Sequence, residues 1–256
     1  MTDFKGYDKD FRLDNKVTLI TGSAKGIGKA IAELFSEKGS NLILVDMDKS
    51  VTDVSEGLSK KVKTLALVYD ISISANIPKI VSDSLKVFPK IDILVNSAGV
   101  GLIDDAESIS EEIWDKTIAV NLKAIFMLSQ AVGREMIKNK KGKIINIASI
   151  AGPIAFEKHS AYTASKAGVI GLTKNMALEW AKHGINVNAI SPIVTLTEMG
   201  RTVWVGEVGE NMKKKIPIGR FNDPSEIAAA ALFLASDATD MITGHNLIID
   251  GGYSIQ

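Results

Sequence analysis

The chain has 256 residues, of which 46% are hydrophobic and 23% are charged. This composition excludes a disordered chain and predicts a sizeable buried core. Thirty basic residues balance thirty acidic ones, so the chain lacks the excess positive charge of nucleic-acid-binding proteins, and we expect no nucleic-acid partner. The absence of cysteine excludes disulfides and thiolate metal sites.

The N-terminal segment mixes charged and aromatic residues. Residues 1–12 lack the apolar stretch of a signal peptide, and we treat residues 1–14 as an extension before the first strand. No run of the sequence approaches the roughly 18 to 20 apolar residues that a membrane span needs. We therefore expect a soluble, cytoplasmic protein without a membrane partner.

Short runs of apolar, often β-branched residues alternate with longer segments of helical spacing. The runs predict strands at residues 16–21, 41–46, 63–68, 91–96, 143–148, 185–190 and 247–250. The segments between them predict helices at residues 26–38, 51–60, 75–88, 111–138, 160–182 and 224–235. Strands that are apolar nearly throughout are typical of a parallel sheet covered on both faces. The pattern predicts an α/β fold with a doubly wound parallel sheet of about seven strands.

Residues 1–256 contain no repeat, low-complexity tract or linker, so we predict a single domain. Residues 197–215 interrupt the alternation, with Gly200, Gly206 and Gly209 among mixed polar and apolar residues. We interpret this segment as a mobile lid over the substrate, and an ordinary surface excursion is the alternative.

A glycine-rich turn at residues 21–28 joins the first strand to the first helix. Glycines in this context permit a tight turn and let the backbone approach a pyrophosphate, whose charge is stabilised by the N-terminus of the following helix. A plain strand-to-helix turn is the alternative. We predict that the turn holds a dinucleotide through Gly22, Ser23, Lys25, Gly26, Ile27 and Gly28.

Asp46 ends the second predicted strand, eighteen positions after Gly28. An acid at this distance accepts hydrogen bonds from the adenosine ribose of a dinucleotide. Its carboxylate would repel the 2′-phosphate of NADP, and the next residue, Met47, offers no positive charge to receive that phosphate. The sequence therefore predicts NAD as the cofactor.

Polar or small residues follow the third and fourth predicted strands. They are Asp70, and then Asn96, Ser97, Ala98 and Gly99. Ligands of open α/β sheets bind at the carboxyl ends of the strands. We predict that Asp70, Asn96, Ala98 and Gly99 line the adenine and ribose side, and ordinary turn residues are the alternative.

Tyr162 and Lys166 are four residues apart in a helical segment, which places both side chains on one face. A phenol titrates near pH 10, so it carries protons near neutrality only where a neighbour such as an ammonium group favours the phenolate. Ser149 lies at the end of the fifth strand, and Asn121 lies in the long helical segment before it. We predict that these four residues converge in a catalytic site.

The chain resembles the short-chain dehydrogenase/reductase family from Asn15 to Tyr253. The glycine turn, residues 96–99, the four polar residues and the stretch 188–197 occur in the family's order and spacing. The resemblance implies a Rossmann-type sheet in the order 3-2-1-4-5-6-7 and a homotetramer. It adds to the predicted cofactor contacts Ile71, Tyr162, Lys166, Pro192, Val194 and Thr197, the last at the nicotinamide carboxamide.

The resemblance also implies a role for each catalytic residue. Tyr162 would be the general base for alcohol oxidation and the general acid for carbonyl reduction. Ser149 would hydrogen-bond the reacting oxygen. Lys166 would lower the pKa of Tyr162 and hold the nicotinamide ribose, and Asn121 would help hold a water that leads protons to solvent.

Two residues depart from the family's pattern. Pro192-Ile193 stands where the family usually has Pro-Gly, and Ser97 replaces a second asparagine. Neither change removes a reacting group. We expect both to affect the fit of the cofactor more than the chemistry.

The three histidines, His159, His183 and His245, are scattered, and we predict no metal site. His159 is the exception of interest because it and Glu157 precede Tyr162, within reach of a substrate hydroxyl. A weaker hypothesis places a divalent ion at the C-terminal carboxylate, where an ordinary salt bridge is the alternative.

Within the family, NAD-linked polyol and sugar-acid dehydrogenases are the most similar, on residues 96–99, 224–228 and 251–253. We therefore predict oxidation of a secondary alcohol, in a sugar alcohol, to the ketose. A 3-oxoacyl thioester reductase is the alternative, which Asp46 disfavours because reductive biosynthesis generally uses NADPH. A non-catalytic nicotinamide sensor or scaffold is a remote alternative, which the intact catalytic set disfavours.

Overall fold

The computed structural model describes residues 6–255, without the side chains of Met199 and Thr202. The first five residues of the predicted extension and the C-terminal carboxylate of Gln256, with its hypothetical ion, lie outside this range. Within the described range no helix is long and apolar enough to cross a membrane.

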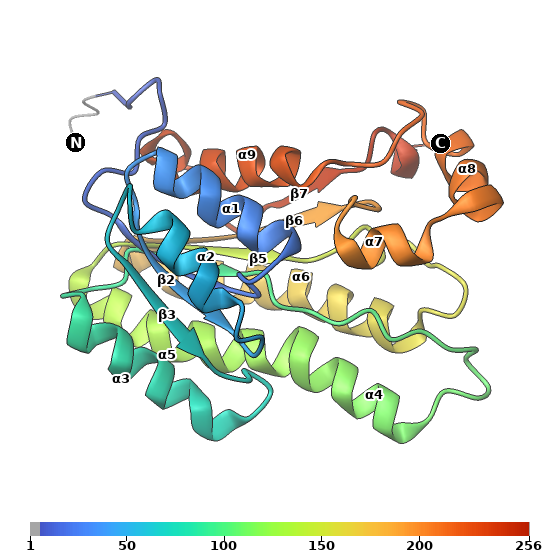
Figure 1. The fold of residues 1–256 in the computed structure, drawn as a ribbon, viewed down its shortest axis with the longest axis horizontal. Helices are drawn as coiled ribbons and strands as arrows, with labels where there is room; N and C mark the ends of the chain where they lie inside the picture. The colour runs from blue at the N-terminus through green and yellow to red at the C-terminus, as the bar shows by residue number, and fades with distance from the viewer. Residues whose placement is uncertain (1–5, 256) are drawn as a thin grey trace.

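Seven strands of the described chain form one sheet (Figure 1). The strands are β1 (Val17–Thr21), β2 (Asn41–Asp46), β3 (Thr64–Val68), β4 (Ile93–Asn96), β5 (Gly142–Ile147), β6 (Ile185–Pro192) and β7 (Asn246–Ile249). Their order is β3-β2-β1-β4-β5-β6-β7, and every pairing is parallel. The predicted strands and their order are confirmed, with ends that differ by up to two residues.

Helices cover both faces of the sheet (Figure 1). One face carries α1 (Gly26–Glu37), α2 (Val51–Leu58) and α9 (Pro224–Ala235), and the other carries α3 (Ile77–Val87), α5 (Ala124–Asn139) and α6 (Ser160–Trp180). Because the strands are buried on both sides, each face has its own apolar core, one centred on Phe35 and Ile31, the other on Leu128 and Met136. Short 3-10 turns occur at Ser74–Asn76, Ala181–His183, Asp237–Thr239 and Tyr253–Ile255.

The predicted helix at residues 111–138 is one continuous helical run with a break in its hydrogen-bond pattern. It consists of α4 (Glu111–Ile118), a π-turn η2 (Ala119–Lys123) and α5. Ser110 begins the run, and its side chain accepts a hydrogen bond from the backbone of Ile113 at 3.2 Å. A π-turn inside a helix often marks a functional position, and Asn121 lies in this one.

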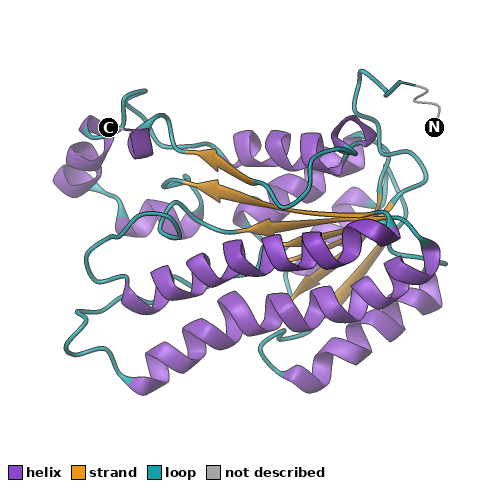
Figure 2. Cartoon of the chain, turned by 180° about the vertical axis from the view of Figure 1, so that it is seen from behind, coloured by secondary structure: helices purple, strands orange, loops and turns teal. Residues whose placement is uncertain are grey.

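Residues 197–215 are more regular than the sequence pattern indicated. They form two short helices, α7 (Glu198–Val203) and α8 (Gly206–Lys214), at the end of the sheet near the C-terminus (Figure 1). Figure 2, seen from behind, shows the strand arrows pointing toward this end of the molecule. Met212 of α8 is buried with Ile150, Ile193, Ile216 and Phe221 in a small cluster separate from both main cores. The two helices therefore lie over the carboxyl ends of the strands.

Candidate active site

The glycine turn after β1 approaches the neighbouring backbone very closely. Gly22 has a φ of +66°, and a Cβ there would lie 2.7 Å from the Cα of Ala98. A Cβ on Gly28 would collide with the carbonyl oxygen of Gly22. Both positions require glycine, so the tight turn expected from the sequence is present.

The open side of this turn faces α7. Gly26 has a φ of +59°, and a Cβ there would lie 3.2 Å from the side-chain methyl of Thr197. Lys25 precedes α1 without a side-chain cap, and its ammonium lies 3.5 Å from Glu198 and 3.9 Å from Asp48. Glycine turn, end of β2 and start of α7 thus meet at one crevice.

Asp46, the last residue of β2, also stabilises the glycine turn. Its carboxylate accepts hydrogen bonds from the backbone N–H groups of Ala24, at 3.0 Å, and Asp48, at 2.9 Å. The side chain is half-buried, and each carboxylate oxygen retains capacity for a further hydrogen bond. Ser23 is also part of the turn's support, since its hydroxyl donates to the carbonyl of Val45.

Several residues predicted to bind the cofactor at the ends of β3 and β4 have side chains that already contact other parts of the protein. Asp70 accepts hydrogen bonds from the backbone and hydroxyl of Ser72, at 2.8 and 2.7 Å. Asn96 is buried, and its amide donates to Ser129 and Asn146 between the strands and α5. Ile71 is buried in the core. The side chains of Asn96 and Ile71 thus lie in the interior of the fold, which the sequence pattern did not indicate.

Thr21, a residue that the sequence reasoning passed over, joins the two halves of the crevice. Its buried hydroxyl accepts hydrogen bonds from the backbone N–H groups of Ser97, at 3.1 Å, and Ala98, at 3.2 Å. These bonds come to the backbone, so serine in place of the usual asparagine at position 97 leaves them intact. A threonine at the end of a strand beside a glycine turn was the signal available for it.

Tyr162, Lys166 and Ser149 meet beyond the end of β5. Tyr162 and Lys166 lie on the same face of α6, and the Lys166 ammonium is 5.7 Å from the centre of the phenol ring. Lys166 donates a hydrogen bond of 2.9 Å to the carbonyl of Ile147, the last residue of β5. The Ser149 hydroxyl accepts from the backbone of Ala151 at 3.1 Å and is hydrogen-bonded to Tyr162. The predicted convergence of these residues is present.

The electrostatics of the pair differ from the expectation. Burial raises the pKa of the Tyr162 phenol above its usual value, and the hydrogen bond with Ser149 lowers it only in part. Burial lowers the pKa of Lys166 to about 8. In this structure desolvation of the phenolate outweighs the hydrogen bond with Ser149, and lowering of the Tyr162 pKa by Lys166 stays a prediction.

Asn121 fixes the loop that closes the site. Its side chain exchanges two hydrogen bonds with the backbone of Val100, at 2.8 and 2.9 Å, and donates a third to Ser165 at 3.3 Å. A Cβ on Gly99 would lie 3.3 Å from Asn121 and 3.6 Å from the Lys166 ammonium. Asn121, Gly99 and Lys166 are therefore neighbours, at the place where the π-turn widens the helix.

The segment after β6 borders the same space. The carbonyl of Pro192 accepts from the backbone of Ile150 at 3.1 Å, and the carbonyl of Val194 accepts from the backbone of Asn222 at 3.0 Å. Ile193, which replaces the expected glycine, has no positive φ, and its side chain is buried in the small apolar cluster. Thr197 caps α7 by accepting from Gly200 at 3.1 Å. The departure at position 193 is thus accommodated as core packing.

Aromatic rings flank the phenol on the substrate side. His159 stands edge-on to Tyr162 with 5.9 Å between ring centres, and Phe156 lies 5.7 Å from His159. Phe156 also stacks on Tyr253 at 5.8 Å. The sequence reasoning missed Phe156 and Tyr253, because residues nearly a hundred positions apart give no local pattern. Among the described residues, no group of three or more acidic or histidine side chains is arranged to hold a metal ion.

The crevice fits a dinucleotide on the evidence of its own backbone. Side chains are absent where Gly22 and Gly28 approach other backbone, and α1 begins there without a side-chain cap. Backbone N–H groups at a helix N-terminus bind phosphate oxygens, and an acid at the neighbouring strand end accepts hydroxyl groups. The donor and acceptor set thus matches a pyrophosphate next to a ribose.

Comparisons with known proteins agree with this geometry. A family model described as enoyl-(acyl carrier protein) reductase matches residues 22–254. An NAD-dependent glycerol dehydrogenase of Listeria innocua is 56% identical over 99% of both chains. A D-threitol dehydrogenase of Mycolicibacterium smegmatis is 46% identical over 97% of this chain and 96% of its own. A 3-oxoacyl-[acyl-carrier-protein] reductase of Thermotoga maritima is 40% identical over 95% of this chain and 100% of its own.

Solved structures show the same relationship. Levodione reductase superposes with a TM-score of 0.92 at 30% identity, over 95% of this chain and 99% of its own. NAD⁺-bound xylitol dehydrogenase superposes with a TM-score of 0.90 at 31% identity, over 93% of this chain and 99% of its own. The chain belongs to the short-chain dehydrogenase/reductase family.

Proposed function

We propose that the protein is an NAD-dependent dehydrogenase that oxidises a secondary hydroxyl of a small sugar alcohol to the ketone. The observation that carries the proposal is the meeting of Ser149, Tyr162 and Lys166 beside the glycine crevice. The names of the two relatives at 56% and 46% identity, a glycerol and a D-threitol dehydrogenase, support a polyol as substrate.

The proposed cofactor site uses both halves of the crevice. The glycine turn holds the pyrophosphate, Asp46 accepts the hydroxyls of the adenosine ribose, and Asp70 borders the adenine. Lys166 and Tyr162 hold the nicotinamide ribose, and the backbone around Gly99, Pro192 and Val194, with Thr197, borders the nicotinamide. When bound, NAD⁺ accepts the hydride that leaves the carbon being oxidised.

Residues of the chain then accept and transfer the proton of the reacting hydroxyl. Ser149 hydrogen-bonds the reacting hydroxyl, and the phenolate form of Tyr162 takes the hydroxyl proton as the carbonyl bond forms. The Lys166 ammonium favours that phenolate. We propose that Asn121 positions a water that passes the proton toward solvent.

Asp46 favours NAD over NADP. Its carboxylate stands where the 2′-phosphate would add negative charge, and Asp48 adds a second acid 3.9 Å from Lys25, the one cation of the turn. A 3-oxoacyl thioester reductase remains the second candidate, since one relative at 40% identity bears that name.

The test is a rate comparison with purified protein. We expect turnover with NAD⁺ and at least one of a panel of glycerol, tetritols, pentitols and hexitols, and little turnover with NADP⁺. Activity confined to NADPH-dependent reduction of a 3-oxoacyl thioester would instead establish the second candidate. Cofactor binding without turnover on any of these compounds would favour a sensor or scaffold.

We propose that residues 1–256 act as one catalytic domain in which α7 and α8 form a lid over the substrate. The ammonium of Lys25 bridges the glycine turn to Glu198 at the start of α7, which supports a lid that closes onto the cofactor side. A cytoplasmic location also belongs to the proposal, since a diffusible nicotinamide cofactor must be regenerated by other enzymes.

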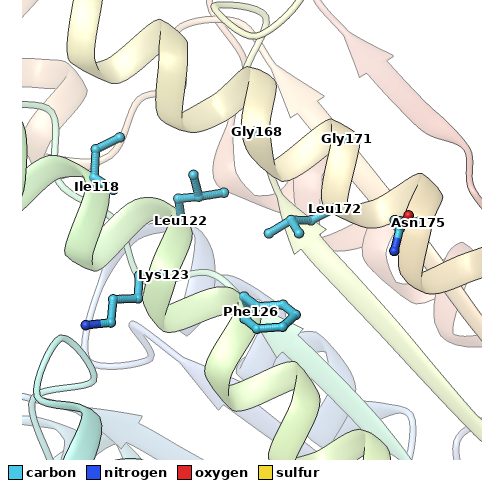
Figure 3. A pocket seen from close by; sticks show the side chains of 8 residues that line it. All are labelled: Ile118, Leu122, Lys123, Phe126, Gly168, Gly171, Leu172 and Asn175. Carbon is cyan, nitrogen blue, oxygen red and sulfur yellow. The ribbon is translucent and has the colours of Figure 1, made fainter.

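A homotetramer is the proposed assembly. An apolar groove runs between the helical run of α4 and α5 and helix α6, lined by Leu122, Phe126 and Leu172 (Figure 3). Leu178 on α6 is 82% exposed, and Met241 before β7 is 96% exposed. An apolar groove and exposed apolar side chains support contacts with further copies of the chain. Light scattering should give a tetramer for the wild type and a smaller species for Leu178→Lys.

A further inference from the structure

His159 stands beside the proposed catalytic phenol without belonging to the proton path. It precedes the first turn of α6, is half-buried, and meets the Tyr162 ring edge-on at 5.9 Å between ring centres. A substrate whose reacting oxygen is hydrogen-bonded to Tyr162 therefore has its adjacent carbons near the imidazole. The position suits recognition of the substrate outside the reacting carbon.

The hydrogen bonds of the ring fix what His159 can recognise. Its Nδ1 is hydrogen-bonded to the carbonyl oxygen of Glu157, and a carbonyl oxygen only accepts, so Nδ1 carries the proton. In the neutral ring Nε2 is then a hydrogen-bond acceptor. Within residues 6–255, no protein group is recorded as a partner of Nε2. The ring thus offers one oriented acceptor to a hydroxyl donor.

Aromatic and apolar side chains surround this acceptor. Phe156 and Tyr253 stack beside the imidazole, and Ile150 and Ile193 are buried behind Ser149 in the small apolar cluster. Pockets of this kind fix the orientation of a ligand through a few placed polar groups among apolar ones. A neutral hydroxyl of the substrate finds Nε2 in this wall.

We propose that His159 is a specificity-determining residue, which accepts a hydrogen bond from the substrate hydroxyl on a carbon next to the one that is oxidised. The inference rests on the proposed polyol oxidation and names the feature of the substrate that the site recognises. A site that hydrogen-bonds a hydroxyl discriminates against the analogue that lacks it, because its own polar group is then left without a partner.

The test uses three alcohols that are all oxidised at the second carbon: glycerol, 1,2-propanediol and 2-propanol, with two, one and no adjacent hydroxyls. The wild type should show kcat/KM falling along this series. His159→Asn keeps a donor near the position of Nδ1 but has no atom at Nε2, and His159→Gln places an amide near Nε2. His183→Asn, at the far end of α6 in Ala181–His183, is the matched control.

We expect His159→Asn to lower kcat/KM for glycerol by about 10- to 100-fold, mainly through KM, and to leave kcat/KM for 2-propanol nearly unchanged. His159→Gln should recover part of the preference, and His183→Asn should match the wild type. Equal losses on all three alcohols would overturn the inference, since they indicate a structural role. Polyol oxidation by the wild type with an unchanged preference in His159→Asn would overturn it too. Failure of the wild type on every polyol would contradict the proposed function itself.

Discussion

The two ends of the crevice are built in different ways. On the cofactor side, Gly22 and Gly28 bring backbone against backbone, and Asp46 and Thr21 lock the turn through main-chain N–H groups. On the substrate side, Ser149, Tyr162 and His159 present side chains whose surroundings come from α8 and the C-terminal turn. Close contacts between backbone segments can be made by few residue types, whereas a surface formed by side chains can be made by many. We therefore expect the cofactor side to tolerate fewer substitutions, and we propose that the substrate side decides which alcohol is oxidised.

The largest effect is expected from Tyr162→Phe. The substitution removes only the hydroxyl, so the affinity for NAD⁺ should remain close to that of the wild type. Loss of the acid–base group should lower kcat by about 10²- to 10⁴-fold. Rates of cofactor reduction and cofactor-binding titrations measure the two quantities. Near-normal turnover in this variant would exclude Tyr162 as the base.

The pH dependence tests the same side of the comparison. Because burial raises the pKa of Tyr162, its base form is scarce at neutral pH. Alcohol oxidation should thus accelerate as pH rises into the alkaline range, while carbonyl reduction, which needs the protonated phenol, should not. Lys166, with a pKa of about 8, loses its charge within that range. Because the Lys166 charge can favour the phenolate only below about pH 8, Lys166→Met should lower the oxidation rate most near neutral pH, and an unaltered pH profile would contradict its electrostatic role.

Gly28→Ala tests the cofactor side, since the added methyl would collide with the Gly22 carbonyl oxygen. We expect a Kd for NAD⁺ raised by about 10- to 100-fold and a lower unfolding temperature, as the turn must shift. Gly57→Ala in α2 is the control, because a Cβ there meets nothing within 4 Å. That variant should bind normally and gain about 0.5–1 kcal/mol of stability. Normal binding by Gly28→Ala would show that the turn is not the phosphate site.

Asp46→Asn should weaken the preference for NAD⁺ over NADP⁺. The amide oxygen keeps a hydrogen bond to the turn, but the charge that repels a 2′-phosphate is gone. The ratio of kcat/KM for NAD⁺ to that for NADP⁺ should fall about tenfold, or about 1.4 kcal/mol. Asp53→Asn, on the exposed first turn of α2, should leave the ratio unchanged. An unaltered preference in Asp46→Asn would assign the discrimination to another residue.

The smallest effect is expected where the two regions touch. Glu198→Gln removes the ion pair with Lys25, whose two side chains are 73% and 63% exposed. Exposed pairs contribute at most about 1 kcal/mol, so release of reduced cofactor should accelerate by about two- to fivefold. Glu207→Gln on α8 serves as the control. Stopped-flow displacement measures the rate of cofactor release. A rate equal to that of the control would contradict a role of the Lys25–Glu198 ion pair in retaining the cofactor.

The sequence predicted the cofactor region better than the substrate region. The strands, the glycine turn and Asp46 are local patterns, and each lies where we expected, whereas the strand order followed from the family resemblance. The contacts of Asn96 were not predictable, because its buried partners Ser129 and Asn146 come from distant elements. The helices α7 and α8 were not predicted, since helices of six and nine residues that contain glycine have weak periodicity. The pKa of Tyr162 depends on burial, which spacing along a helix does not reveal.

The cluster of Ile150, Ile193, Met212, Ile216 and Phe221 packs separately from the two main cores. Because these side chains belong to neither main core, we expect the proposed lid, α7 and α8, to exchange amide hydrogens without loosening the sheet. Substitutions in this cluster should therefore destabilise a small part of the fold only. Ile193 belongs to the cluster, so the residue that replaces the family's usual glycine contributes to packing beside the proposed substrate site.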